Sequence, residues 1–180
     1  LWLLGRRPDI HDNLREEAAR RGITSDRLIF APSMKFEPHI ARYQVADLFL
    51  DTMPYNAHTT ASDALWMGCP VLTTFGGTFS GRVAASLLRA AGIPELAVAD
   101  LAAYQKLAIE LGRHPDRLHA LRQRLVEGRA TGPLFDLPRF TRALERAYEG
   151  MWAIYEDGEG PRPFSVTDDW HGATQAVTPA

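Results

Sequence analysis

Short apolar runs alternate along this chain with longer stretches in which apolar residues recur every three or four positions. The runs at 1–4, 28–30, 48–50 and 71–73 are too short for helices and are bounded by polar residues, Gly or Pro. Such runs are typical of buried β-strands, and a further short strand is expected at 96–98. The first half of the chain is therefore predicted to alternate strands and helices.

Helical periodicity fills the intervals between these strands. The spacing predicts helices at 10–21, 37–46, 59–67 and 80–91, with Gly22 and Gly68 as stops. The second half is mainly helical, with Asp100 capping one helix and a last helix at 137–155 whose apolar stripe is expected to face the core. This order predicts an α/β fold, in which a Rossmann-like parallel sheet is flanked by helices and followed by a helical C-terminal segment.

Composition and charge exclude several classes of protein. The 180 residues carry 20 Lys and Arg against 22 Asp and Glu, a net charge of −2, so the strong basic field of a nucleic-acid binder is missing. No apolar run reaches the ~18 residues that a membrane span needs. The single cysteine, Cys69, excludes an internal disulfide framework. We expect a cytoplasmic protein that binds neither nucleic acid nor membrane.

The two ends of the chain suggest its domain organisation. The chain starts at Leu1, inside an apolar run, which we interpret as the C-terminal part of a larger protein. From Gly158 onward the helical pattern gives way to Gly, Pro, Thr and Ala. We therefore expect one lobe over residues 1–157 and a disordered tail over residues 158–180.

The richest candidate site follows the third predicted strand, where a polar loop leads into a helix. The loop runs from Asp51 to His58, and the helix opens with Thr59 and Thr60, with Asp63 one turn further on. Ligands of parallel sheets bind beyond the carboxyl ends of the strands, where helix N-termini offer unpaired N–H groups. A diphosphate could bind Thr59 and Thr60, Asp63 could hold a ribose diol, and His58 would lie at the entrance. The alternative is a capping box formed by Thr60 and Asp63, which needs no ligand.

A second candidate cluster follows the second strand, with Lys35, Glu37, His39 and Arg42. His39 and Arg42 share a helical face, where an imidazole could stack on a base and a guanidinium could donate to its carbonyls. The alternative is a solvated helix face.

Other chemistries find less support in the sequence. The glycine-rich segment 75–82 lacks the Lys and Ser or Thr spacing of a triphosphate loop, and a tight turn explains its glycines. The histidines lack metal-ligand spacing, and no serine-hydrolase elbow is present. Cys69 follows Gly68 in a predicted buried turn, which favours an inert thiol.

One long stretch resembles a known family. Within residues 28–88 the chain reads Leu-Ile-Phe-Ala-Pro, then His39 and Arg42, then Ala-Asp-Leu-Phe-Leu-Asp-Thr, Asn-Ala-His-Thr-Thr, Asp-Ala-Leu-Trp-Met-Gly-Cys-Pro-Val and Arg-Val-Ala-Ala-Ser. This string resembles the C-terminal catalytic lobe of the O-GlcNAc transferase family, in particular its bacterial members. The similarity extends through Pro-Leu-Phe at 133–135 to the last helix. The resemblance implies the GT-B architecture of two Rossmann-like lobes, of which the C-terminal lobe holds most of the sugar nucleotide.

The resemblance also implies roles for the candidate residues that face the nucleoside. By position, His39 would stack near uracil and Arg42 would assist base recognition. Lys35 and Asp63 would hold the ribose. The family lysine sits one position after Lys35, where this chain has Phe36.

For the helix that starts after His58, the resemblance favours a bound ligand over the capping box, because a capping box does not predict the surrounding string. It implies that Thr59 and Thr60 bind the diphosphate of a UDP-sugar and that His58 lies near the sugar and the leaving phosphate. The polar helix end would stabilise the charge on departing UDP, so neither a metal nor another cofactor is expected. Tyr55 occupies a position that is smaller in the animal enzymes, near the expected N-acetyl group, which leaves the sugar open between GlcNAc, glucose and another hexose.

The resemblance therefore implies the donor-binding lobe of an inverting UDP-sugar dependent protein O-glycosyltransferase, with UDP-GlcNAc favoured. It would act on Ser or Thr hydroxyls of a protein or peptide acceptor, together with an N-terminal lobe and helical repeats. The catalytic base and the phosphate-binding lysine would belong to segments before Leu1, so this piece alone is expected not to catalyse transfer. Two alternatives stay open: an inactive sugar-nucleotide-binding or scaffold module, and a sugar-nucleotide epimerase on the same architecture.

Overall fold

The computed structural model describes residues 1–5 and 7–167. Its helices run in the order α1 (Pro8–Arg20), α2 (Phe36–Ala41), α3 (Thr59–Trp66), α4 (Val83–Ala90), α5 (Leu101–Arg113), α6 (Pro115–Gly128) and α7 (Leu137–Glu156). Short 3-10 helices are η1 (Ser25–Arg27), η2 (Arg42–Val45), η3 (Pro94–Leu96) and η4 (Pro133–Phe135). The strands are β1 (Trp2–Leu4), β2 (Ile29–Ala31), β3 (Phe49–Leu50), β4 (Val71–Thr74) and β5 (Ala97–Val98). The predicted α/β alternation is confirmed.

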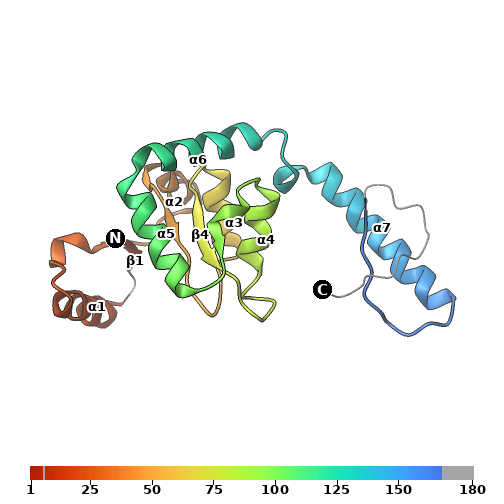
Figure 1. Ribbon diagram of the computed structural model, residues 1–180, viewed down its shortest axis with the longest axis horizontal. Helices are drawn as coiled ribbons and strands as arrows, with labels where there is room; N and C mark the ends of the chain where they lie inside the picture. Colours follow the sequence, from red (N-terminus) through yellow and green to blue (C-terminus); the bar gives the residue numbers. More distant parts are fainter. Residues whose placement is uncertain (6, 168–180) are drawn as a thin grey trace.

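The strands pair in parallel, as predicted, but in two sheets rather than one. β1 pairs with β2, and β4 lies between β3 and β5. β4 is buried along its whole length, whereas Trp2, Leu4 and Ile29 are 41%, 54% and 59% exposed. The prediction of one sheet of buried strands is therefore wrong for the first two strands. The two sheets differ in how many helices cover them. Helices α3, α4 and α5 pack on β4 (Figure 1), while much of the β1–β2 pair stays in contact with solvent.

The core is centred on β4 and the helices around it. Leu65 of α3, Val71 of β4, Leu88 of α4 and Leu111 of α5 are all fully or almost fully buried in one cluster, which Leu121 of α6 completes. The predicted stops hold, because Gly22 and Gly68 have φ values of 75° and 79°, in the left-handed region that favours glycine. The predicted cap is also confirmed, since the Asp100 carboxylate accepts from the Ala103 N–H at 2.8 Å.

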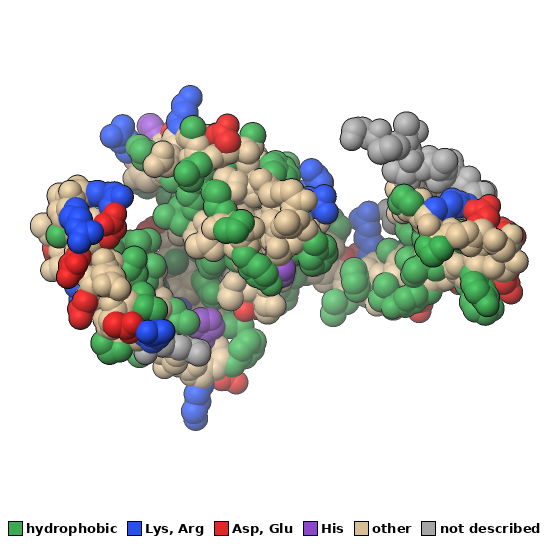
Figure 2. All heavy atoms as spheres, turned by 90° about the horizontal axis from the view of Figure 1, so that it is seen from below, with side chains coloured by type: hydrophobic (Ala, Val, Ile, Leu, Met, Phe, Trp, Pro, Cys, Tyr) green, Lys and Arg blue, Asp and Glu red, His purple; other side chains and the backbone are tan. Residues whose placement is uncertain are grey.

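The final helix has the predicted position but not the predicted environment. Leu137, Phe140, Tyr148 and Tyr155 of α7 are between 60% and 72% exposed. Figure 1 shows α7 extending away from the helices around β4, and Figure 2 shows hydrophobic side chains along its surface. The prediction that this stripe faces the core is therefore wrong. Helical periodicity shows that one face is apolar, but it does not say what covers that face.

Two further segments differ from the sequence expectations. The helix expected at 37–46 is α2 followed directly by the 3-10 helix η2, and the helix expected at 80–91 begins only at Val83. Within the predicted tail, residues 158–167 form no helix or longer strand, and residues 168–180 lie outside the described part. The lobe boundary and the disorder of the tail stay predictions. Within the described residues, no helix is both long and apolar enough to cross a membrane.

Candidate functional site

The loop between β3 and α3 is organised by one buried carboxylate. Asp51 Oδ1 accepts from the N–H groups of Thr52 at 2.8 Å and Ala57 at 2.7 Å, and its Oδ2 accepts from the Thr73 hydroxyl at 2.6 Å. The backbone carbonyl of Asp51 accepts from the Tyr104 hydroxyl at 2.9 Å. Burial, and secondarily the charge of Asp51, raise the pKa of Tyr104 to about 12. The start and the end of the loop are thus tied to β4 and α5 through a single residue.

The loop delivers the chain to the N-terminus of α3, which has no capping side chain. The N-cap residue is His58 rather than Thr60, and its side chain makes no capping hydrogen bond. The capping-box alternative for Thr60 and Asp63 is therefore wrong. Thr59 and Thr60 are exposed, and the first N–H groups of a helix have no intrahelical partners. Together with the helix dipole, they form an electropositive end that suits an anion.

His58 lies among aromatic rings beside this helix end. Its ring stacks on Tyr55 with 4.9 Å between centroids and meets Phe79 edge-on at 6.2 Å. Its Nε2 lies 3.2 Å from the carbonyl oxygen of Ser80. A carbonyl only accepts, so Nε2 carries the proton, and in the neutral ring Nδ1 is left as an acceptor. His58 can therefore receive a hydrogen bond from a hydroxyl bound at the start of α3.

The glycine-rich segment 75–82 supports His58 rather than forming a phosphate loop. The Gly76 N–H donates to the Gly81 carbonyl at 2.7 Å, and a Cβ on Gly81 would lie 2.9 Å from the Gly76 Cα. The Ser80 carbonyl, which contacts His58, also accepts from the Asn56 N–H at 3.1 Å. The tight-turn explanation of these glycines is confirmed, because the backbones of Gly76 and Gly81 approach too closely to leave room for a side chain.

The second candidate cluster lies on α2 and η2. The Arg42 guanidinium contacts His39 Nδ1, donates to the Pro32 carbonyl at 3.2 Å and lies over the Trp2 ring at 5.8 Å. His39 meets Tyr43 edge-on, with 5.7 Å between ring centroids. The pairing of His39 and Arg42 on one face is confirmed, and it is a connected cluster rather than a freely solvated helix face.

Tyr43 links this cluster to α3 and was missed by the sequence reasoning. Burial raises the pKa of the Tyr43 phenol, and the negative charge of Asp63 raises it further. The Tyr43 side chain also packs against the buried cluster that contains Ala61, Ala64 and Leu65 of α3. No hydrogen bond to the Asp63 carboxylate occurs among the residues that the structure describes. The spacing of His39 and Tyr43, four positions apart, was the signal that could have placed Tyr43 beside the cluster.

Two further residues singled out in the sequence are Lys35 and Cys69. Lys35 precedes α2 as its N-cap residue, is exposed, and makes no capping hydrogen bond through its side chain. Cys69 is fully buried, as predicted, and burial raises the pKa of its thiol to about 11, which favours an inert thiol. In the described part of the chain, no group of three or more His, Cys, Asp or Glu is placed to hold a metal ion.

The candidate site thus has two parts from different segments: the N-terminus of α3 with Thr59, Thr60 and Asp63, and the α2–η2 segment with His39 and Arg42. The first part suits an anion, and the second presents an imidazole and a guanidinium. Tyr43 belongs to the second part and packs against the buried cluster that contains Ala61, Ala64 and Leu65 of α3.

Comparisons with known proteins show which chains this one is similar to. The model of glycosyl transferase family 41 matches residues 1–144. The chain is 36% identical over 170 residues to a probable UDP-N-acetylglucosamine–peptide N-acetylglucosaminyltransferase, SEC, of Arabidopsis thaliana, covering 94% of this chain and 17% of that protein. It is 35% identical over 158 residues to the UDP-N-acetylglucosamine–peptide N-acetylglucosaminyltransferase of Caenorhabditis elegans, covering 88% of this chain and 14% of that protein. The chain thus spans only a small part of each relative.

A solved structure extends the likeness to the fold. A variant of the O-GlcNAc transferase of Thermobaculum terrenum superposes with a TM-score of 0.75 at 37% sequence identity, covering 81% of this chain and 28% of that one. The expected GT-B relationship is therefore supported by backbone geometry as well as by sequence. The family match over residues 1–144, with relatives 36% and 35% identical along most of the chain, shows that this chain belongs to glycosyl transferase family 41.

Proposed function

We propose that this chain is the donor-binding lobe of an inverting protein O-glycosyltransferase that uses a UDP-sugar, with UDP-GlcNAc as the donor. The observation that carries the proposal is the N-terminus of α3, which has exposed first-turn residues, no capping side chain and a carboxylate, Asp63, one turn away. Family membership supports it, because the relatives named above are UDP-N-acetylglucosamine–peptide transferases.

In this proposal the diphosphate lies at the start of α3. The N–H groups of Thr59 and Thr60 and their hydroxyls donate to its oxygens, and the helix dipole favours its negative charge. When the acceptor hydroxyl attacks the anomeric carbon, the bond from that carbon to the diphosphate breaks and UDP leaves with the electron pair. The preorganised N–H groups stabilise the charge that develops on UDP, so the proposal needs no metal. His58 Nδ1 accepts from a hydroxyl of the sugar.

The nucleoside lies between α3 and the α2–η2 segment. Asp63 accepts from the ribose diol, since its carboxylate has free acceptor positions. His39 stacks on uracil and Arg42 assists base recognition, because an imidazole has a π-face and a guanidinium donates to carbonyls. In this proposal Lys35, the exposed N-cap residue of α2, donates to a ribose hydroxyl.

The remaining parts of the reaction belong to segments beyond this chain. We assign the base that takes the acceptor proton, and the second lobe, to the rest of the protein, along with helical repeats that hold the acceptor polypeptide. The exposed apolar faces of β1, β2 and α7 support a second lobe, because they offer surface that the described residues leave uncovered. A cytoplasmic location stays a prediction from the sequence.

The test is calorimetry of nucleotide binding to the complete protein. Asp63→Asn should weaken UDP binding by about tenfold or more, because hydrogen bonds to a charged carboxylate are among the stronger ones. It should weaken binding of 2′-deoxy-UDP much less, since that ligand lacks one of the two hydroxyls. Thr59→Val, which keeps the shape of the side chain, should weaken UDP binding about fivefold. Asp116→Asn, an exposed carboxylate in the first turn of α6, is the matched control and should have no effect.

Unchanged UDP affinity in both site variants would overturn the proposed donor site. Mass spectrometry of the products formed from UDP-GlcNAc and cell lysate then separates the activities. Modified proteins support the transferase, a converted sugar nucleotide indicates an epimerase, and bound but unreacted donor indicates a scaffold.

A further inference from the structure

One arginine of α6 holds the end of the segment that carries His39 and Arg42. Arg122 Nη1 donates to the Gln44 carbonyl at 3.1 Å, and its Nη2 donates to the Ala46 carbonyl. These carbonyls lie at the C-terminal end of η2, 78 and 76 residues away in the sequence. Arg122 is half-buried, and a cation at a helix C-terminus is favourably placed.

A second arginine of the same region holds the end of α3. Arg129, which directly follows α6, donates through Nη1 to the Trp66 carbonyl at 3.1 Å and lies over the Trp66 ring at 5.1 Å. Arg122 and Arg129 are seven residues apart, close to two helical turns, so they point to the same side of α6. A Cβ on Gly68, just after α3, would lie 3.2 Å from Val126, which confirms that α6 runs close to the end of α3.

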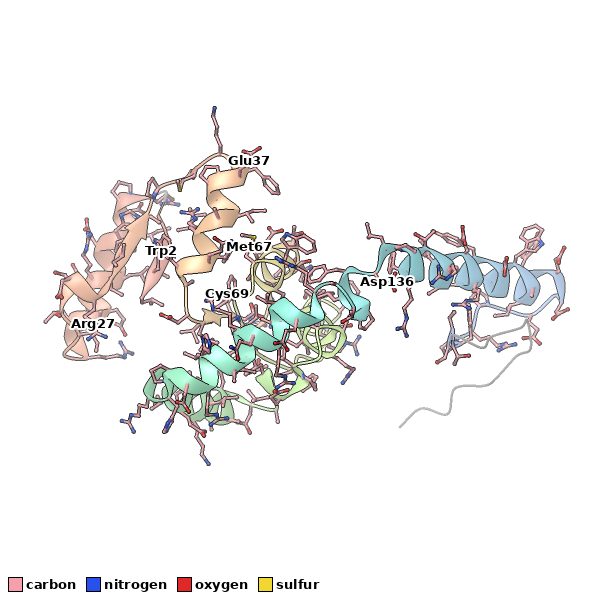
Figure 3. All side chains as sticks on the ribbon, turned by 90° about the horizontal axis from the view of Figure 1, so that it is seen from above. Trp2, Arg27, Glu37, Met67, Cys69 and Asp136 are labelled. Atoms are coloured by element: carbon pink, nitrogen blue, oxygen red, sulfur yellow. The ribbon has the colours of Figure 1, made fainter. Side chains whose placement is uncertain are left out.

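The two elements held in this way are the two parts of the candidate site. α3 carries Thr59, Thr60 and Asp63, and the α2–η2 segment carries His39 and Arg42. In Figure 3, Glu37 marks the beginning of the α2–η2 segment, and Cys69 lies toward its other end, beside α6. Cys69 belongs to the same buried cluster as Leu121 and Leu125 of α6, which agrees with this placement.

We propose that Arg122 is a positioning residue for base recognition: it fixes the α2–η2 segment relative to α3, so that a nucleotide whose diphosphate lies on α3 presents its base to His39 and Arg42. This inference rests on the proposed function and adds the residue that makes the site discriminate between bases. The physical reason is the planar guanidinium fork, which bonds two carbonyls at once and so restricts both position and rotation of η2. Without the Arg122 guanidinium, the α2–η2 segment would become ordered only when the nucleotide binds, and this ordering would lower the affinity.

The test compares three ligands on the complete protein by calorimetry: UDP, ADP and inorganic pyrophosphate. Arg122→Gln should weaken UDP binding about tenfold and leave pyrophosphate binding unchanged, so that the preference for UDP over ADP falls. Arg122→Lys keeps the charge but lacks the fork, and should restore part of the preference. Arg124→Gln is the matched control. Arg124 lies on the same helix and donates to the Gly92 carbonyl and to Glu95, away from the α2–η2 segment.

Each outcome decides the inference. A reduced UDP-to-ADP preference in Arg122→Gln, with the control unchanged, supports it. An unchanged preference overturns it, and so does equal weakening of all three ligands, because a merely structural role would affect diphosphate and base alike. If the unmodified protein binds no UDP, the proposed function itself fails, and this result is distinguishable because it requires no variant.

Discussion

Replacing Asp51 by alanine tests whether one carboxylate holds the loop that leads to α3. The change removes the acceptor for three donors: the N–H groups of Thr52 and Ala57 and the hydroxyl of Thr73. A buried donor without a partner costs about 1–3 kcal/mol. Thr52 is exposed, so water reaches its surroundings, and the Thr73 hydroxyl keeps a long contact to the Thr74 carbonyl at 3.4 Å. We therefore expect a loss of about 3–5 kcal/mol in the free energy of unfolding.

Urea unfolding followed by circular dichroism measures this loss. Asp100→Ala is the matched control, because its carboxylate accepts a single exposed N–H bond at 2.8 Å and its removal should cost about 1 kcal/mol. Asp51→Asn should lie between the two, since the amide oxygen can still accept while its NH₂ group meets the Thr73 hydroxyl. A loss for Asp51→Ala no larger than that of the Asp100 control would refute the reasoning.

Two further predictions concern the glycine-rich turn at 75–82 that supports His58, and the free energy of unfolding at high pH. Gly81→Ala should destabilise the fold by about 1–3 kcal/mol, because the new Cβ would lie 2.9 Å from the Gly76 Cα. Gly77→Ala is the control and should not destabilise the fold, because the space around Gly77 is open. Equal melting temperatures for the two variants would contradict this prediction. In the folded state, burial raises the pKa of Tyr104 from an ordinary 10.0 to about 12. The neutral phenol therefore contributes fully to the free energy of unfolding below pH 10.0, and this contribution is lost as the pH rises through about 12. Tyr104→Phe should therefore show a smaller fall in unfolding free energy than the unmodified chain between pH 10 and pH 12, and curves that run parallel across this window would exclude the shift.

Local sequence signals predicted those features that depend on neighbours along the chain. The Gly22 and Gly68 stops and the Asp100 cap follow from backbone conformation and from hydrogen bonds over a few residues, so sequence alone located them. The facing pair of His39 and Arg42 follows in the same way from helical spacing. The order of strands and helices along the chain also follows from local periodicity.

Local sequence signals did not predict the contacts between segments that are distant along the chain. Tyr43 of η2 packs against the buried cluster that contains residues of α3, and the Arg122 contacts join α6 to η2 across 76 and 78 residues. The spacing of these residues along the chain does not predict such contacts. The capping-box alternative also could not be decided from sequence, because Thr60 and Asp63 have the right types and spacing whether or not the bonds form.

By itself the sequence determined the class of fold, the position of the loop that enters α3 and the residue types that the site offers. Only the tertiary structure decided how strands and helices share their apolar surface: β4 became the buried centre, the β1–β2 pair formed a separate sheet, and the stripe of α7 stayed in solvent. The physical reason is that periodicity reports which face of an element is apolar, a local property. Burial of that face depends on which other elements reach it, and this is set by contacts across the whole chain.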